Sequence, residues 1–253
     1  MAFISALAAV VAAQNATVCP VQGTKTINNQ AEADSIAACP TFTGSISIIN
    51  GPYATTSLNG IKEITGTLTT KDGSKVAADS LERIGGTFEN HDSYTVTLDF
   101  PKLSYVAGIS MSESYEPRPG LNNLLMPSLE TVDGDITVTG LRYLNNWQMP
   151  SLQRVNGLFK VIGNPFLFSL TLDKLETVAP GGIDISGSFW NGVSFASLQS
   201  VHPKFSFVFH SPGNCTEFAA LREPGGPLAS TEQYSCVANC ADINADGSCA
   251  RQQ

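Results

Sequence analysis

Basic residues are scarce in this sequence. The 253 residues include 14 lysines and arginines against 22 aspartates and glutamates, which gives a net charge of −8. The basic residues are scattered singly and form no stripe, which argues against a nucleic-acid partner. Charged residues make up only 14% of the chain, whereas threonine, serine, asparagine and glycine are plentiful. This composition is typical of an extracellular, β-rich protein whose acidic surface mainly keeps it soluble.

Common signatures of catalytic and metal sites are also absent. There is no CxxC pair for zinc, no HxH or HExxH spacing, and no GxSxG serine motif. The three histidines, His91, His202 and His210, lie in different coils or in the cap. No Asp-Asp pair or Gly-His-Gly segment of the polygalacturonase type occurs. We therefore expect no cofactor, no metal centre and no catalytic residue.

Long apolar runs are missing as well. Residues 1–13 are apolar and small, with Val11 and Ala13 at the −3 and −1 positions of a signal-peptidase site, so we predict a signal peptide there. No apolar run follows the last cysteine, and we expect neither a transmembrane helix nor a GPI-anchor signal. Glycosylation sequons begin at Asn15 and Asn214. Together with paired cysteines, these features predict a secreted protein.

Cysteine is absent from the whole middle of the chain. The six cysteines lie at the two ends, at Cys19, Cys39, Cys215, Cys236, Cys240 and Cys249. Although six cysteines allow 15 pairings, we expect Cys19–Cys39, Cys215–Cys236 and Cys240–Cys249. We predict an N-terminal cap over 14–38, mildly helical from Thr24, and a disulfide-tied C-terminal cap over 211–253 with little regular structure. Such caps would cover the exposed ends of a stack of repeats.

The sequence does contain a repeat of about 23 residues. The segment 126–138 (MPSLETVDGDITV) recurs as 149–161 (MPSLQRVNGLFKV). Counted from the central leucine, the template is apolar at −3, Leu at 0, Val or Ile at +3, Gly at +5, and apolar at +7 and +9. Position 0 falls at Cys39, Ile61, Leu81, Leu103, Leu129, Leu152, Leu175 and Leu198. The pattern therefore defines eight coils, six of which have glycine at +5.

The pattern within each coil predicts a strand. Apolar and polar residues alternate after the glycine, which is the period of a half-buried strand, and turn formers such as 163–165 (GNP) follow. A coil of about 20–25 residues with one strand and no amphipathic helix is typical of leucine-rich-repeat-like stacks. We predict an all-β, right-handed parallel β-solenoid over 39–210, with about eight coils and disulfide caps.

Two segments interrupt the repeat and are our candidates for a ligand surface. They are the longer loop 112–120 and the aromatic turn 189–192. Insertions in solenoids map to loops on one side, often the binding side. We expect Tyr115, Phe189 and Trp190 on a possible ligand surface, and a solvated loop without function is the alternative.

A weak calcium motif lies near the C-terminus. Asp242, Asn244 and Asp246 match the first half of a calcium loop, in which oxygen ligands at positions 1, 3 and 5 hold Ca²⁺. Position 12 is Gln253, where a bidentate glutamate is needed, and Cys249 lies inside the loop. A turn within a disulfide loop is therefore the better interpretation.

The repeated Pro-Ser-Leu-x-x-Val-x-Gly-x-Ile-x-Val of 127–138 resembles the receptor L-domain repeat. More narrowly, the chain from Cys19 to Cys236 resembles fungal cell-wall organisation proteins built from that repeat, which are commonly secreted, glycosylated and GPI-anchored. The resemblance implies an extracellular, non-enzymatic protein with a role in wall integrity, morphogenesis or surface recognition. Such proteins usually end in a Ser/Thr-rich stalk and a hydrophobic tail, where this sequence has Cys240 and Cys249.

Three functions remain open at this point. The first is a monomeric structural or recognition protein that presents its sheet and loops to cell-wall glycans or surface proteins. The second is a polysaccharide lyase or hydrolase on a parallel β-helix, for which Asp133, Asp135 and Asp184 are the acids to consider. The third is a secreted effector that binds a host protein. Paired acids in a groove would favour the enzyme, and a flat face of Thr, Ser and Asn would favour binding.

Overall fold

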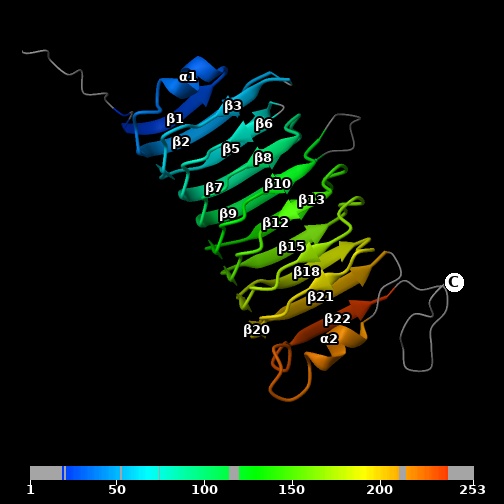
Figure 1. Ribbon diagram of the computed structural model, residues 1–253. Helices are drawn as coiled ribbons and strands as arrows, with labels where there is room; N and C mark the ends of the chain where they lie inside the picture. The colour runs from blue at the N-terminus through cyan, green and yellow to red at the C-terminus, as the bar shows by residue number, and fades with distance from the viewer. Residues whose placement is uncertain are drawn as a thin grey trace, which may run out of the picture.

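Successive coils stack along one axis, and each coil places its strands beside those of its neighbours (Figure 1). The computed structural model describes Cys19 and residues 21–51, 53–73, 75–113, 120–210 and 215–238. All strand pairs in these ranges are parallel. The predicted parallel β-solenoid is therefore confirmed. No helix among these residues has the length and apolar character needed to cross a membrane.

One sheet of 15 strands runs the whole length of the stack. Its main path is β1 (Val21–Ile27), β2 (Thr41–Ile49), β4 (Glu63–Ile64), β7 (Arg83–His91), β9 (Tyr105–Ser112), β12 (Ile136–Thr139), β15 (Leu158–Ile162), β18 (Gly182–Gly187), β21 (Lys204–Phe209) and β22 (Gln233–Val237). Beside this path lie β5 (Leu68–Asp72), β11 (Thr131–Val132), β14 (Arg154–Val155), β17 (Thr177–Val178) and β20 (Ser200–Val201). In five coils position +3 lies in a separate two-residue strand, β4, β11, β14, β17 or β20, and in the other three it lies within the long strands β2, β7 and β9.

Two smaller sheets are formed by other segments of the coils. The larger has the order β13 (Asn146–Gln148), β10 (Asn123–Leu125), β8 (Thr97–Asp99), β6 (Lys75–Ala77) and β3 (Thr55–Ser57). The smaller pairs β16 (Leu170–Thr171) with β19 (Val193–Ser194). These strands are short because each coil turns again within a few residues, at the segment that leads back to position 0, which is Pro-Ser-Leu at 127–129 and 150–152.

The core is a set of apolar ladders inside the coils. Every residue at positions −3, 0 and +3 of the eight coils is buried, and none is more than 8% exposed. Residues at the same position pack against their counterparts in the next coil, as Val132 pairs with Val155 and Val155 with Val178. Full burial of such a side chain contributes about 1.5–3 kcal/mol, so the ladders are the main source of stability.

The glycine at +5 allows neighbouring coils to approach closely at the corner. A Cβ atom on Gly157 would lie 2.6 Å from the carbonyl oxygen of Gly134 in the preceding coil. Gly108 is different, because a Cβ atom there would find its nearest neighbours at 3.5 Å. Its coil has one residue fewer at the corner, since Ile84 and Phe88 pair with Val106 and Ile109.

The N-terminal end has more strand than the sequence predicts. β1 pairs with β2 from Thr24 to Ile27, so the first part of the segment expected to be mildly helical is a strand. The helix is confined to α1 (Gln30–Asp34), where the side chain of Asn29 accepts a hydrogen bond from the Glu32 amide at 3.0 Å. The edge position of β1 accounts for this, because pairing with β2 satisfies its backbone. Cys19 and Cys39 form a disulfide here, as expected.

The C-terminal end also has more regular structure than expected. Here α2 (Thr216–Ala220) and β22 follow the last coil, and β22 adds a strand beside β21. Phe218 on α2 packs against Phe205, Phe207 and Phe209, whose ring centroids lie 4.8–6.1 Å from its own. This contact covers the last apolar ladder, which the sequence pattern alone did not reveal. The expected disulfide between Cys215 and Cys236 ties α2 to β22.

Candidate functional site

The register of the large sheet aligns one outward residue from each coil in a continuous row. We call it the hydroxyl row; it comprises Thr26, Ser47, Thr69, Glu89, Ser110, Thr137, Lys160, Asp184, Ser206 and Ser235. None of these residues is buried, whereas their neighbours along the central strands, such as Ile136 and Val138 on either side of Thr137, point into the core. The row arises because strand side chains alternate between faces. Seven of its ten residues are serine or threonine, and the other three, Glu89, Lys160 and Asp184, are charged.

A shallow hollow interrupts this flat face at Gly108. It has a volume of 280 Å³, and the polar side chains around it are those of Thr87, Ser110, Asp135 and Thr137. The hollow follows from the shorter corner of this coil, which places a glycine where the neighbouring strand has Thr87. The Ser110 hydroxyl lies 3.2 Å from Nε2 of His91.

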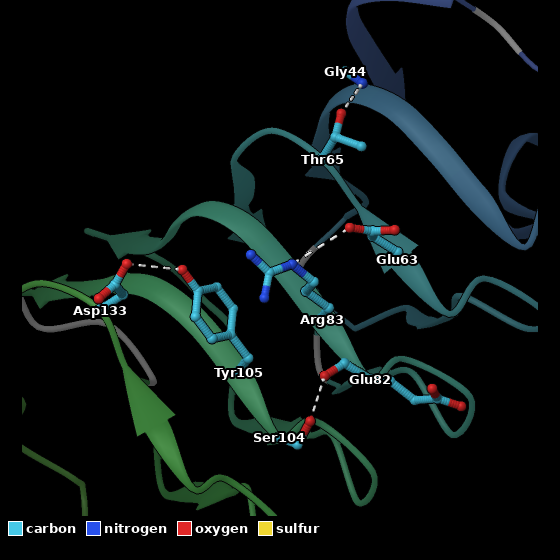
Figure 2. Close-up of polar contacts among 8 residues, drawn as sticks. All are labelled: Gly44, Glu63, Thr65, Glu82, Arg83, Ser104, Tyr105 and Asp133. Atoms are coloured by element: carbon cyan, nitrogen blue, oxygen red, sulfur yellow. Dashed lines mark hydrogen bonds and ion pairs between the residues drawn. The ribbon is translucent and has the colours of Figure 1, made fainter. Parts of the chain in front are cut away.

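A second set of outward side chains links the coils at the corner. Figure 2 shows Arg83 between Glu63 and the ring of Tyr105, with Tyr105 pointing on to Asp133. The Arg83 Nε atom is 3.4 Å from Glu63 Oε1, and its guanidinium carbon is 3.6 Å from the Tyr105 ring centroid. The Tyr105 hydroxyl donates a hydrogen bond of 3.1 Å to Asp133 Oδ2. Exposed contacts of this kind contribute little each, but they connect four successive coils.

The acids considered for catalysis are engaged in contacts within the fold. Hydrogen bonds from Asn156 and then Tyr105 lower the pKa of Asp133, so this group is ionised at neutral pH and donates no proton. Asp135 Oδ1 accepts a hydrogen bond of 2.7 Å from the Leu158 amide. Asp184 lies 2.9 Å from Lys204 Nζ. These contacts give each acid a structural role.

A groove runs across the coils at the C-terminal ends of the long strands, away from the corner at position +5. Its floor consists of Gly140, Gly163 and Gly187, the residues at the ends of β12, β15 and β18. Glu113 lies at one end of the groove and His210 at the other. Its volume is 380 Å³. The groove exists because three successive coils have no side chain at this position.

Glu113 is the acid in this groove, and its pKa is raised. Burial raises the pKa most, and the charge of Asp92 adds to the effect. The amides of Leu121 and Arg142 oppose it, because they donate hydrogen bonds of 2.9 and 3.2 Å to the two carboxylate oxygens. The carboxylate therefore connects the end of β9 with Leu121, which follows the loop 112–120, and with Arg142 in the next coil. Within the described ranges, no three His, Cys, Asp or Glu side chains gather as a metal site.

The predicted ligand surface is only partly as expected. Trp190 is 63% exposed, as predicted, but Phe189 is only 4% exposed. The expectation for Phe189 is wrong because its ring turns inward and packs against Phe207, with centroids 5.6 Å apart. Tyr115 lies outside the described residues, as do Asn15, Asn214, Asp242, Asn244, Asp246, Cys240 and Cys249.

The groove and the hollow were not predicted from the sequence. The sequence pattern marks the glycines of the groove floor only as turn formers. A signal was present in the sequence, because Gly140, Gly163 and Gly187 recur at the spacing of the coils. Gly108 fitted the +5 template, and only the strand register shows that its surroundings are open.

Fold and surfaces together define an elongated parallel β-solenoid with disulfide-bonded ends and a flat hydroxyl face. No family model matches the chain, and no solved structure matches it. Over 147 residues, the chain is 33% identical to Protein ecm33 of Aspergillus fumigatus, a match that covers 55% of this chain and 36% of that protein. The chain thus spans little more than a third of the curated relative. This homology agrees with the resemblance to fungal cell-wall proteins that the repeat indicated.

Proposed function

We propose that the protein is a secreted, non-enzymatic component of the fungal cell wall or cell surface with a structural or recognition role. The hydroxyl row is the observation that carries this proposal. It extends over ten strands, seven of which contribute a serine or threonine, and the strands follow one another at the regular spacing of about 4.8 Å. A polymer or protein surface with many hydrogen-bonding groups can lie flat against such a face.

The state of the acids supports a non-enzymatic role. A glycosidase needs one protonated and one ionised carboxyl group on either side of the scissile bond. Asp133, Asp135 and Asp184 are each held by neighbouring groups of the fold. Their contacts are those of a stack of coils that stabilise one another, and the similarity to Protein ecm33 is in keeping with a wall protein.

A carbohydrate-active enzyme is the second candidate, and Glu113 is the observation that favours it. A carboxyl group with a raised pKa in a groove is suited to act as a general acid. The experiment that separates the two functions is incubation of wild-type protein and E113Q with cell-wall polysaccharides, followed by measurement of reducing sugar. We expect no release by either protein. Release by the wild type that disappears in E113Q would establish the enzyme and refute our proposal.

Binding itself is tested by sedimentation of the purified protein with isolated cell walls. T137V removes a hydroxyl from the middle of the hydroxyl row and keeps the shape of the side chain. Losing one hydrogen bond costs about 0.5–1.5 kcal/mol, so we expect two- to tenfold weaker binding. The matched control is T171V, the same substitution at an exposed position of β16 in the smallest sheet. Equal binding by wild type, T137V and T171V would exclude the hydroxyl row as the contact face.

A further inference from the structure

Three exposed aromatic residues follow the floor of the groove in consecutive coils. Tyr143, Phe166 and Trp190 are 38%, 49% and 63% exposed. Each comes three residues after one of the floor glycines, Gly140, Gly163 and Gly187 in turn. The turns that carry these aromatic residues therefore lie at the same edge of the stack as the groove, with one exposed aromatic residue in each of three coils.

We propose that this edge is a binding site for a neutral, linear polysaccharide chain that lies along the stack. This inference rests on the proposed wall or surface function and adds a site and a ligand class to it. A sugar ring has an apolar face of C–H groups and a rim of hydroxyls. Recognition of such a ring needs aromatic surface together with a few polar groups. Here Tyr143, Phe166 and Trp190 supply the aromatic surface.

The polar groups of the groove suit the hydroxyl rim of the sugar. Glu113 and His210 lie at its two ends, and Ser188 lies between them. Neither sign of charge dominates along this edge, because the groove is lined by one carboxylate, Glu113, one guanidinium, Arg142, and the imidazole of His210. A polyanion would need a row of cations and a polycation a row of acids, so a neutral chain fits best.

An extended peptide fits less well, because it would bind by adding a strand. The backbone amides along the floor already donate to neighbouring coils. Gly140 donates to the Ile162 carbonyl at 3.0 Å, Gly163 to Ser186 at 3.4 Å, and the His210 amide to Gly187 at 2.8 Å. These amides are therefore not available to pair with a peptide backbone.

The repeat distance of the stack favours a polymer over a single sugar. Neighbouring parallel strands lie about 4.8 Å apart, close to the length of one hexose unit in an extended chain. Equivalent residues in successive coils can therefore meet successive sugar units. Three aromatic coils imply that affinity rises with the length of the ligand up to at least three sugars and then levels off.

Titration with short oligosaccharides tests the site. The probes are the hexamer of β-1,3-linked glucose and the hexamer of β-1,4-linked N-acetylglucosamine, with hexagalacturonate as the anionic comparison. The chain has two tryptophans; Trp147 packs against the core, whereas Trp190 is exposed. We expect a neutral hexamer to bind and to shift the fluorescence of Trp190 to shorter wavelength. Isothermal titration calorimetry measures the variants, because W190A and W190F lack the fluorescent side chain. We expect W190A and F166A each to weaken binding about tenfold, and W190F to restore most of it.

Tyr53 provides the matched control, because it is 90% exposed in a turn of another coil, away from the groove. Y53A should bind the hexamer as tightly as the wild type. The inference is overturned if neither neutral hexamer binds, if W190A and F166A bind as well as the wild type, or if hexagalacturonate binds better. Binding to whole cell walls distinguishes failure of the groove site from failure of the proposed function. If W190A and F166A keep full binding to walls while T137V loses it, the groove site is wrong and the wall function stands.

Discussion

Replacing Gly157 by alanine should destabilise the stack, because the corner has no room for a methyl group. The new Cβ atom would lie 2.6 Å from the Gly134 carbonyl oxygen, whereas ordinary contacts begin at 3.4 Å. The coils that contain Leu129 and Leu152 would have to separate locally by roughly 1 Å. Overpacking of this kind costs about 1–3 kcal/mol, and stretching one backbone hydrogen bond adds about 1 kcal/mol. We expect a loss of about 2–4 kcal/mol in the free energy of unfolding.

Gly108 is the matched control for this prediction. A methyl group there would have its nearest neighbours, Asp135 and Thr87, at 3.5 Å. The φ angle of Gly108 is not in the left-handed region, so alanine fits without backbone strain. Removing the freedom of glycine in the unfolded chain should then leave G108A unchanged or about 0.4–1 kcal/mol more stable.

Urea denaturation followed by circular dichroism, with the disulfides intact, measures both variants. We expect a lower midpoint for G157A and an unchanged or higher midpoint for G108A. Equal losses in the two variants would show that glycine at +5 is needed for some reason other than close approach of the coils. A G157A protein as stable as the wild type would refute the geometric argument outright.

Three further predictions concern the ends of the stack and its acids. The disulfides Cys19–Cys39 and Cys215–Cys236 span 20 and 21 residues, so C19S/C39S and C215S/C236S should each lose about 3 kcal/mol; unchanged urea midpoints would contradict this. Carboxyl NMR should show a pKa for Asp133 below its usual value of 3.8, and N156A should raise this pKa. The stabilising effect of Asp133 is present above pH 3.8 and is lost as the pH falls through the pKa of the folded state. The pKa of Glu113 should lie above its usual value of 4.5. The protonated side chain therefore favours folding below pH 4.5, and this contribution is lost as the pH rises through the pKa of the folded state. The same pH dependence of stability in E113Q and the wild type would argue against this.

The repeating core could be predicted from the sequence because its signal is periodic. Leu129, Val132 and Ile136 recur at the spacing of the coils, and each copy reinforces the assignment of the others. Parallel stacking then follows, since every coil presents the same apolar positions to its neighbour. The end structures lack this repetition. Phe218 on α2 packs against the last ladder, but a single phenylalanine in an irregular tail gives no periodic signal.

The surface features depend on residues that differ from one coil to the next, which a repeat template does not describe. Phe189 is buried and the adjacent Trp190 is exposed, and the alternation of apolar and polar residues does not determine which of the two points inward. The missing corner residue in the coil of Leu103 shifts the buried positions to Ile109 and Met111, one residue earlier than the template. The hydroxyl row could be inferred only once the pairing register of every strand was known.

The direction of the hydrogen bonds in this stack has a mechanical consequence. They run from coil to coil along the axis, so tension between the two ends loads them in series rather than all together. Only the terminal segments are locked by disulfides, at Cys19–Cys39 and Cys215–Cys236. A pull along the axis would therefore open interior coils one after another, each releasing between 20 and 26 residues of slack chain. A protein of this shape yields stepwise under load and absorbs work at each step.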